Sequence, residues 1–339
     1  MSMGACQGRL PAALPLGKRH STRKGRFLMA TIDQARSVAL PRRSASRRFT
    51  LAPYLFILPH LIFFLTFLAW PFFYGIYISL FDFDFLRPEH RPFVGLQNYL
   101  NLFQSTSIQF DDFWRSMKNT GIFVLWSVPP LIFFALLLAV LLNGKYRGRN
   151  FFRGLYFAPY ALSVTVAGVL WRWLFEQSGL INSWLGGLGL TQVSWLGAMP
   201  WAWIAITVAT LWWTIGFNTV IFLTALQDIP EALYEAASID GATGLGQFFY
   251  ITIPMLRPVL TFVITITLLA SANLFGQPYI MTGGGPVQQT EPVMMRIFSE
   301  GIQQNQMGSA AAMSVFVAAI LLALTGLNFV VFGRGERGR

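Results

Sequence analysis

The segment Glu235–Gly241, of sequence EAASIDG, lies between two long apolar stretches, and nine residues after it comes Ile251–Pro254, of sequence ITIP. The residues before it favour a helix start, because Pro230 has no N–H to leave unpaired in a first turn and Glu231 suits the positive end of a helix dipole. Gly241 tolerates the left-handed conformation that ends a helix. The sequence therefore predicts a short helix with one face of small alanine side chains, which lets another surface approach closely.

Six stretches of the chain are long and apolar enough to cross a membrane. The 339 residues are 54% hydrophobic and 12% charged, and the mean hydropathy is +0.52, which is outside the range of ordinary soluble domains. A spanning helix needs ~20 apolar residues, whereas a barrel strand would alternate in polarity at every second residue. The predicted fold is an all-α membrane protein with one transmembrane domain over residues 51–333. The predicted spans are 54–80, 119–142, 156–175, 201–226, 258–281 and 309–332.

Positive charge is distributed unevenly along the chain. The net charge is +11, and 19 of the 25 Lys and Arg residues lie before residue 51, between residues 143 and 156, at Arg257 or after residue 332. If six helices alternate in direction, these positions share one side of the bilayer, which the positive-inside rule assigns to the cytoplasm. We therefore expect both termini and the Glu235–Gly241 segment in the cytoplasm, and no nucleic-acid partner. Residues 1–50 are expected to form a disordered basic cytoplasmic tail, and residues 334–339 a short cytoplasmic tail.

The Glu235–Gly241 segment resembles the EAA loop of the permeases of ATP-binding cassette (ABC) importers, whose pattern is E-A-A, three residues, G, nine residues and I-x-L-P. The chain departs from this pattern at Ile253, which replaces Leu. Two further segments, Phe93–Tyr99 (FVGLQNY) and Thr282–Pro286 (TGGGP), are similar to elements of the carbohydrate-type permeases, in the same order along the chain. The chain is thereby identified as a member of the binding-protein-dependent inner-membrane components for carbohydrates, of the maltose and glycerol-phosphate type.

The resemblance implies a cytoplasmic coupling helix between the fourth and fifth of six spans, seated in a cleft of a separate ATPase. A second permease subunit, two copies of the ATPase and an extracytoplasmic substrate-binding protein would complete an inner-membrane importer for a sugar or related polyol. ATP and Mg would be held by the ATPase, so this chain is expected to be a transport subunit and not an enzyme. The alternative is a helical hairpin that only joins two spans. The ATPase-coupling residues that the resemblance implies are Glu231, Glu235, Ala236, Ala237, Asp240, Gly241, Ala242 and Pro254.

The chain lacks the motifs that would indicate other chemistry. No G-x-x-x-x-G-K-[ST] phosphate-binding loop occurs, and His20, His60 and His90 are scattered without the spacing of metal ligands. No cofactor or metal is therefore expected on this chain. The alternative functions are a membrane scaffold and an ion-coupled secondary transporter, which usually needs an acidic or His residue within a span. None of the 14 acidic residues lies in the middle of a predicted span, and this favours transport driven by another subunit.

Uncharged polar residues and aromatic rings gather in the fourth and fifth predicted spans. Neutral sugars are bound through hydrogen-bonding side chains and aromatic faces, so these residues are candidates for a substrate path. Several of them lie near the sugar-lining positions of maltose-type permeases, as the resemblance implies. The alternative is that Asn218, Ser271 and Asn273 join neighbouring helices by hydrogen bonds. The predicted path residues are Trp213, Thr214, Phe217, Asn218, Ser271, Asn273 and Gln277.

Overall fold

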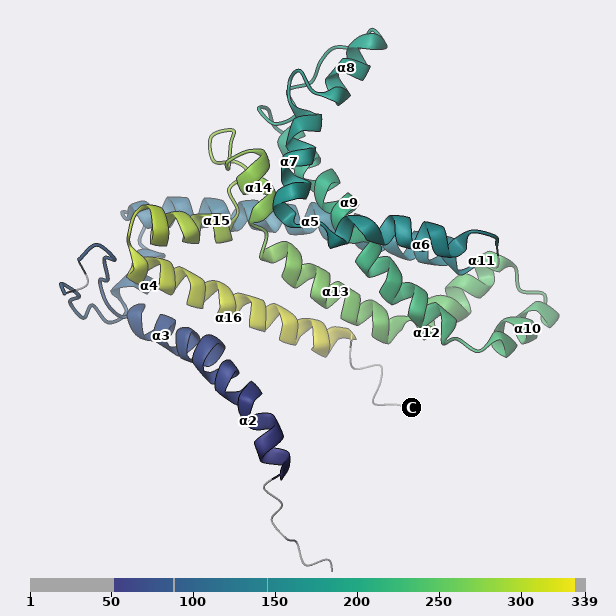
Figure 1. Cartoon of the computed structure of the whole chain (residues 1–339), viewed down its shortest axis with the longest axis horizontal. Coiled ribbons are helices and arrows are strands. Elements are labelled where there is room, and N and C mark those ends of the chain that lie inside the picture. The colour runs from purple at the N-terminus through teal and green to yellow at the C-terminus, as the bar shows by residue number, and fades with distance from the viewer. Residues whose placement is uncertain (1–51, 88, 145, 333–339) are drawn as a thin grey trace, which may run out of the picture. The chain divides into compact units, whose positions relative to one another are not determined.

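The computed structural model describes residues 52–87, 89–144 and 146–332, which are mostly helical (Figure 1). Within these residues, β pairing is limited to two isolated bridges, Phe81 with Phe93 and Asp84 with Gln306. The predicted tails, residues 1–50 and 334–339, lie outside the described residues. The described part of the chain is therefore an all-helical protein, as the hydropathy pattern predicts.

The chain divides into two units, residues 1–63 and residues 64–339. The described part of the first unit is most of helix α2 (Ala52–Phe64), an apolar helix with Pro59 in its interior. The other described helices belong to the second unit. They are η1 (Leu65–Ala69), α3 (Trp70–Ile78), α4 (Gln97–Asn101), α5 (Ile108–Asn143), α6 (Arg149–Phe157), η2 (Ala158–Ala161), α7 (Val164–Phe175), α8 (Leu180–Gly187), α9 (Trp201–Gln227), α10 (Glu231–Ile239), α11 (Gly244–Gln247), η3 (Phe248–Thr252), α12 (Ile253–Met255), α13 (Arg257–Ala272), α14 (Gly276–Met281), α15 (Val293–Phe298), η4 (Ser299–Gln303) and α16 (Met307–Phe332).

Helices α5, α9 and α13 pack together around an apolar core. Ala135 and Ala139 of α5 let α9 approach closely, because small side chains keep the distance between two helix axes short. Phe222 of α9 and Val263 of α13 fill the space beside them, and all four side chains are fully buried. Helix α16 lies along α13 (Figure 1). This packing holds α9 and α13 next to each other, on two sides of the site described below.

Among the described residues, five helices are long and apolar enough to cross a membrane, and a sixth span results if one bent helix pair is counted. This agrees with the predicted multi-pass membrane fold. Helices α9 and α16 cover the predicted spans 201–226 and 309–332, and the predicted span 119–142 lies within the longer α5. The candidate spans are Leu55–Ile78, Ile108–Asn143, Trp201–Gln227, Arg257–Met281 and Met307–Asn328, with Arg149–Ala161 and Val164–Gly187 as the bent pair.

The third predicted span, 156–175, is not one straight helix. Helix α6 and the short η2 end two residues before α7 begins, and the chain bends by 97° between them. Leu162 and Ser163 are extended at the bend, with ψ angles of 148° and 150°, and the Ser163 hydroxyl caps α7 by accepting from Val166 N at 3.3 Å. Pro159 has no N–H to continue the hydrogen bonds of α6. Hydropathy does not detect this bend, because within the predicted span the residues before it, 156–161, and the residues after it, 164–175, are both mainly apolar.

The fifth predicted span, 258–281, is also interrupted. Helix α13 ends at Ala272 and α14 begins at Gly276, with Asn273–Phe275 between them. Pro278 explains the interruption, because in a continuous helix its ring would clash with the carbonyl of Leu274 and leave that carbonyl without its helical donor. The break places Pro278 in the first turn of a new helix, where proline is tolerated.

Two glycines hold helices at short distance around the breaks. Gly216 of α9 lies against the backbone of α6, and a Cβ at this position would come within 2.8 Å of Phe157 Cα. Gly276, at the start of α14, lies against Val164 of α7, whose Cγ2 would be 2.6 Å from an added Cβ. Glycine at both positions therefore lets α6 approach α9 and lets α7 approach α14.

Replacing Gly216 by Ala is expected to destabilise the protein, because the added methyl group would meet backbone atoms that cannot rotate away. We expect a loss of about 1–3 kcal/mol in the free energy of unfolding, as for an overpacked core, measured by thermal unfolding in detergent micelles. Gly121→Ala in α5 is the control, since nothing lies within 4 Å of its added Cβ and alanine stabilises a helix by ~1 kcal/mol over glycine. Equal stability of the two variants would contradict the close approach of α6 and α9.

Candidate functional site

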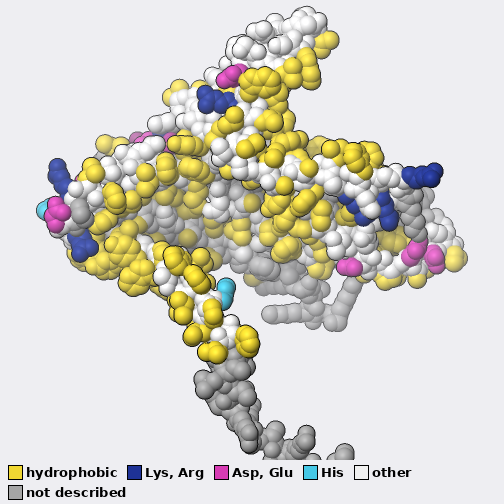
Figure 2. Space-filling model, viewed as in Figure 1, with side chains coloured by type: hydrophobic (Ala, Val, Ile, Leu, Met, Phe, Trp, Pro, Cys, Tyr) yellow, Lys and Arg dark blue, Asp and Glu magenta, His cyan; other side chains and the backbone are white. Residues whose placement is uncertain are grey.

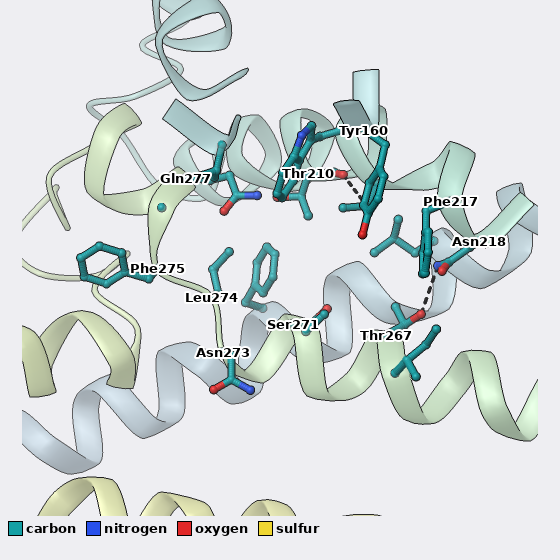
Figure 3. Close-up of a pocket in the computed structure, with 18 residues that line it drawn as sticks. Tyr160, Thr210, Phe217, Asn218, Thr267, Ser271, Asn273, Leu274, Phe275 and Gln277 are labelled. Carbon is teal, nitrogen blue, oxygen red and sulfur yellow. Dashed lines mark hydrogen bonds between the residues drawn. The ribbon is translucent and has the colours of Figure 1, made fainter. Parts of the chain in front are cut away.

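A cavity of about 420 Å³ lies where the two helix breaks face α9. Figure 3 shows polar and aromatic side chains from α9, from the end of α13 and from the two breaks pointing toward one space. The residues that line the cavity include no Asp, Glu, Lys, Arg or His. The structure brings all seven predicted path residues to this wall, with further members that hydropathy and motif reasoning missed. The additional polar and aromatic members are Phe123, Tyr160, Thr210, Thr267 and Phe275.

Aromatic rings form one side of the cavity. Tyr160, at the end of α6 and η2, stacks on Phe217 of α9 with ring centroids 4.8 Å apart and planes 18° apart. Trp213 lies beside them, 6.1 Å from the Tyr160 ring, and its Nε1 donates to Leu162 O at 3.0 Å. Tyr160 lies in η2, and this segment packs directly on α9, a contact between distant parts of the chain that could not be read from the sequence.

Hydrogen bonds between helices fix several polar side chains of the wall. Asn218 Nδ2 donates to Thr267 Oγ1 at 3.0 Å and joins α9 to α13. Ser127 Oγ donates to Ser271 Oγ at 3.2 Å and joins α5 to α13. Asn273 instead bonds within its own helix, where its Nδ2 donates to Leu269 O at 2.8 Å. The alternative of interhelical hydrogen bonding therefore holds for Asn218 and Ser271, which line the cavity as well.

Gln277 differs from the other polar residues of the wall. Its side chain is only 5% exposed, and Figure 3 shows the amide pointing into the cavity. Among the described residues, Gln277 has no side-chain hydrogen bond. Because the amide opens into the cavity, it can exchange hydrogen bonds with water for hydrogen bonds with a polar molecule there.

A second candidate surface lies on α10, the short helix that follows α9 and does not line the cavity. Most of α10 is exposed, and Figure 2 shows acidic side chains at the end of the molecule where α10 lies. The helix begins at Glu231, one residue later than predicted, because Pro230 has ψ of 129° and precedes the helix as its cap. At the other end Gly241 has φ of +80°, and Ala242 N donates to Ala237 O at 2.9 Å, which is the Schellman ending.

Seven of the eight predicted coupling residues lie together at α10, and Pro254 lies apart from them. Glu231, Glu235, Ala236, Ala237, Asp240, Gly241 and Ala242 lie on α10 or in the turn that ends it. Ile239 is 87% exposed beside the three acidic residues, so the surface combines apolar and acidic chemistry. Pro254 lies apart in α12, directly after the wide turn η3, where a missing N–H is consistent with the local loss of regular helical bonding.

A buried ion-pair network at the start of α5 was not predicted. Arg296 of α15 contacts Asp112 at 2.9 Å and Glu300 at 2.7 Å, and Ser309 Oγ donates to Glu300 Oε1 at 3.0 Å. Arg296 and Glu300 are four residues apart in sequence, a spacing that favours an ion pair on a helix. Their contact with Asp112 is set only by the tertiary fold.

The Gly-rich segment after α14 is held on α5 beside this network. Asn119 Nδ2 donates to Gln288 O at 2.9 Å and to Glu291 O at 3.0 Å. The Glu291 side chain is 6% exposed and its Oε2 has no hydrogen-bond partner among the described residues. Burial raises the pKa of Glu291, and the nearby Arg296 and Arg115 only partly oppose this effect.

A cavity with an uncharged lining between apolar helices of spanning length is the arrangement expected of a membrane transport protein. Residues 109–334 match the family of binding-protein-dependent transport system inner membrane components. The chain is 32% identical over 289 residues to a probable ABC transporter permease protein of Bacillus subtilis, covering 84% of this chain and 97% of the relative. It is 33% identical over 312 residues to an arabinooligosaccharides transport system permease protein of Halalkalibacterium halodurans, covering 89% and 96%. It is 35% identical over 286 residues to a trehalose/maltose transport system permease protein of Thermococcus litoralis, covering 84% and 94%.

A solved structure has the same fold. The similar chain comes from a bacterial alginate ABC transporter in complex with its alginate pentasaccharide-bound periplasmic protein. The TM-score is 0.71 at 25% identity, covering 82% of this chain and 92% of the other. The chain belongs to the family of binding-protein-dependent transport system inner membrane components, and it is a multi-pass permease subunit of an ABC importer rather than an enzyme. The prediction of this family from its motifs is confirmed.

Glu291→Gln is expected to flatten the dependence of stability on pH. Because burial raises the Glu291 pKa above its ordinary value of 4.5, the folded protein keeps a proton that the unfolded chain releases. The stability from this proton is full below pH 4.5 and is lost as the pH rises through the raised pKa. The melting temperature of the wild type should therefore fall relative to that of the variant as the pH rises. Glu89→Gln, which changes an exposed carboxylate, is the control, and parallel pH profiles of all three proteins would rule out the buried ionisation.

Proposed function

We propose that this chain is one permease subunit of an ATP-driven importer for a neutral sugar or polyol, and that the substrate passes through the cavity between the two helix breaks. The observation that carries the proposal is the chemistry of the cavity wall. It combines stacked aromatic rings, hydroxyl and amide groups and no charged side chain among its described members. Rings of this kind bind the apolar faces of sugars, while the polar groups bind their hydroxyls.

The absence of charge in the wall favours a neutral substrate over an acidic one. Moving an anion from water into an apolar space costs roughly several kcal/mol of desolvation free energy, unless a cation or several hydrogen-bond donors compensate for it. The cavity wall provides no Lys or Arg for this purpose. Two of the relatives are named for arabinooligosaccharides and for trehalose and maltose, which are neutral carbohydrates. Other relatives are named for sn-glycerol-3-phosphate, and the similar solved structure is an alginate transporter, so the names support a carbohydrate or polyol substrate and the uncharged wall alone carries the preference for a neutral one.

The α10 surface is proposed to bind the ATPase. Exposed alanines allow a partner to approach the helix closely, Ile239 offers an apolar contact, and the carboxylates of Glu235 and Asp240 suit a basic cleft. ATP and Mg are bound by this partner. Closure of an ATPase dimer on ATP moves α10 and so favours one orientation of the transmembrane helices over the other.

The complete transporter is proposed to contain this chain, a second permease subunit, two ATPase copies and an extracytoplasmic binding protein. The α10 segment and both termini are placed in the cytoplasm, because 19 of 25 Lys and Arg residues then lie on the cytoplasmic side. A periplasmic substrate-bound protein accompanies the similar alginate transporter in its crystal structure, which supports an external binding protein here.

Gly241→Val is expected to remove ATPase binding while membrane insertion continues. Valine is strained at the φ of +80° that ends α10, and a left-handed conformation costs ~1–2 kcal/mol for a residue with a Cβ. We expect about tenfold less ATPase to copurify with the tagged chain from membranes, since this strain corresponds to roughly that factor. Gly244→Ala is the control, because nothing lies within 4 Å of its added Cβ. Unchanged copurification and uptake in Gly241→Val would count against the proposed coupling surface.

Gln277→Leu is expected to weaken transport of neutral oligosaccharides. Loss of one hydrogen bond between the amide and a sugar hydroxyl should raise the half-saturating concentration by about two- to tenfold, measured as radiolabelled uptake into proteoliposomes that contain the full transporter. Gln289→Leu is the control, since Gln289 is exposed and does not line the cavity. Uptake of uronic-acid oligosaccharides in preference to neutral ones would overturn the assignment of substrate class.

A further inference from the structure

Helix α10 has few attachments to the rest of the protein. None of its residues is buried, and only Tyr234 and Ala237 are half-buried. It follows α9 after Asp228–Pro230 and leads through α11 and η3 toward α13. A helix this exposed can transmit movement to α13 only if specific contacts attach it to the segments between them, α11 and η3.

Tyr234 makes the first attachment. Its ring packs against the apolar core formed by α5, α9 and α13. Its hydroxyl is 2.9 Å from Thr252 Oγ1, and either atom can donate. Thr252 is buried at the end of η3, so this bond crosses directly from α10 to the segment that leads into α13.

Gln247 makes the second attachment. Its Nε2 donates to Ser238 Oγ at 2.8 Å and is also within 3.4 Å of Ala242 O. The Ser238 hydroxyl in turn donates to Tyr234 O at 2.8 Å. Tyr234, Ser238, Gln247 and Thr252 therefore form one connected set of hydrogen bonds, which we call the α10 brace.

The surroundings of the brace leave room for movement. Beside the packed Tyr234 ring lies a cavity of about 200 Å³, lined by Tyr234, Gln247 and Thr252 of the brace, by Asn143 at the end of α5 and by Leu226 of α9. Beyond the brace, η3 is a π-helical turn, a geometry that often marks functional sites. The next long helix, α13, carries Thr267 and Ser271 of the substrate cavity. The brace therefore lies between the ATPase-binding surface and the cavity wall.

We propose that the α10 brace is a positioning device that makes α10 and η3 move as one body, so that displacement of α10 reaches α13. This proposal rests on the proposed ATP-driven function. Without the brace, α10 still presents its exposed face to the ATPase, and part of its movement is absorbed in the adjacent space. Loss of the brace therefore lowers the number of substrate molecules transported per ATP hydrolysed, while ATPase binding continues.

The test uses variants that remove single hydroxyl groups from the full transporter in proteoliposomes. Tyr234→Phe and Thr252→Val each break the bond between α10 and η3 with little change in shape. Tyr250→Phe is the matched control, because Tyr250 lies in the same turn, is 85% exposed and has no hydrogen bond among the described residues. Thr252→Ser restores a hydroxyl and serves as the rescue variant.

We expect transport per ATP to fall by about two- to tenfold in Tyr234→Phe and in Thr252→Val, the equilibrium factor that corresponds to one hydrogen bond. The double variant should fall no further than Thr252→Val alone, because that change already removes the bond to Tyr234 together with the 3.5 Å bond from Thr252 Oγ1 to Gln247 O. Tyr250→Phe and Thr252→Ser should keep the wild-type ratio. A merely structural defect would lower the amount of active transporter and leave the ratio unchanged, and that result would overturn the proposal.

A second measurement separates this proposal from the proposed function. Spin labels at Ile239→Cys of α10 and Phe262→Cys of α13, in the full chain with Cys6→Ser in nanodiscs, report the distance between the two helices without any ATPase. A broader distance distribution in Tyr234→Phe than in Tyr250→Phe supports the brace, and equal widths overturn it. Failure of the wild-type chain to bind an ATPase would refute the proposed function, and the spin-label result would still decide the role of the brace.

Discussion

The interior of a bilayer provides no water to a broken helix, so every freed backbone group there must find a partner within the protein. This constraint explains the construction of the two interrupted spans. After η2, the carbonyl of Leu162 accepts from Trp213 Nε1 at 3.0 Å. At the end of α13, Asn273 N and Asn273 Nδ2 both donate to the Leu269 carbonyl, at 3.1 and 2.8 Å, and together they close the last turn of the helix. Trp213 and Asn273 also line the cavity, so side chains that bond to the backbone beside the two breaks are part of the cavity wall.

Much of the fold could be predicted from the sequence because membrane helices are encoded locally. Helices α9 and α16 follow from apolar length alone, and α10 follows from the glutamate after Pro230 and from the glycine at its end. The breaks within the third and fifth spans, and the change of chain direction at each, could not be predicted in this way. Pro159 and Pro278 are visible in the sequence, but a proline in a membrane helix can cause a mild kink or a full break. The close packing at Gly216 and Gly276, which accompanies the two breaks, involves residues far apart in sequence and is not visible there.

The candidate site could be predicted in its chemistry more than in its geometry. Trp213, Asn218 and Gln277 were indicated by their polar or aromatic character within apolar spans. Tyr160 could not be, because it reaches the cavity through the packing of η2 on α9, where its ring stacks on Phe217. The pairing of Arg296 with Asp112 joins positions 184 residues apart, and a single sequence carries no signal for such a contact. A buried charge is tolerated only where the fold brings a partner of opposite charge to it. The composition of the chain gives the number of charged residues but not these positions.

Helices α7 and α14 interlock at two points. Val164 of α7 lies in the space that the missing side chain of Gly276 leaves open, and Ile280 of α14 lies in the corresponding space beside Gly168, where it would be 3.1 Å from an added Cβ. Two half-helices joined in this way cannot slide past each other without a clash, so they can turn only together. Any change in the cross-section of the cavity beside them therefore requires both half-helices to rotate against α9 at the same time.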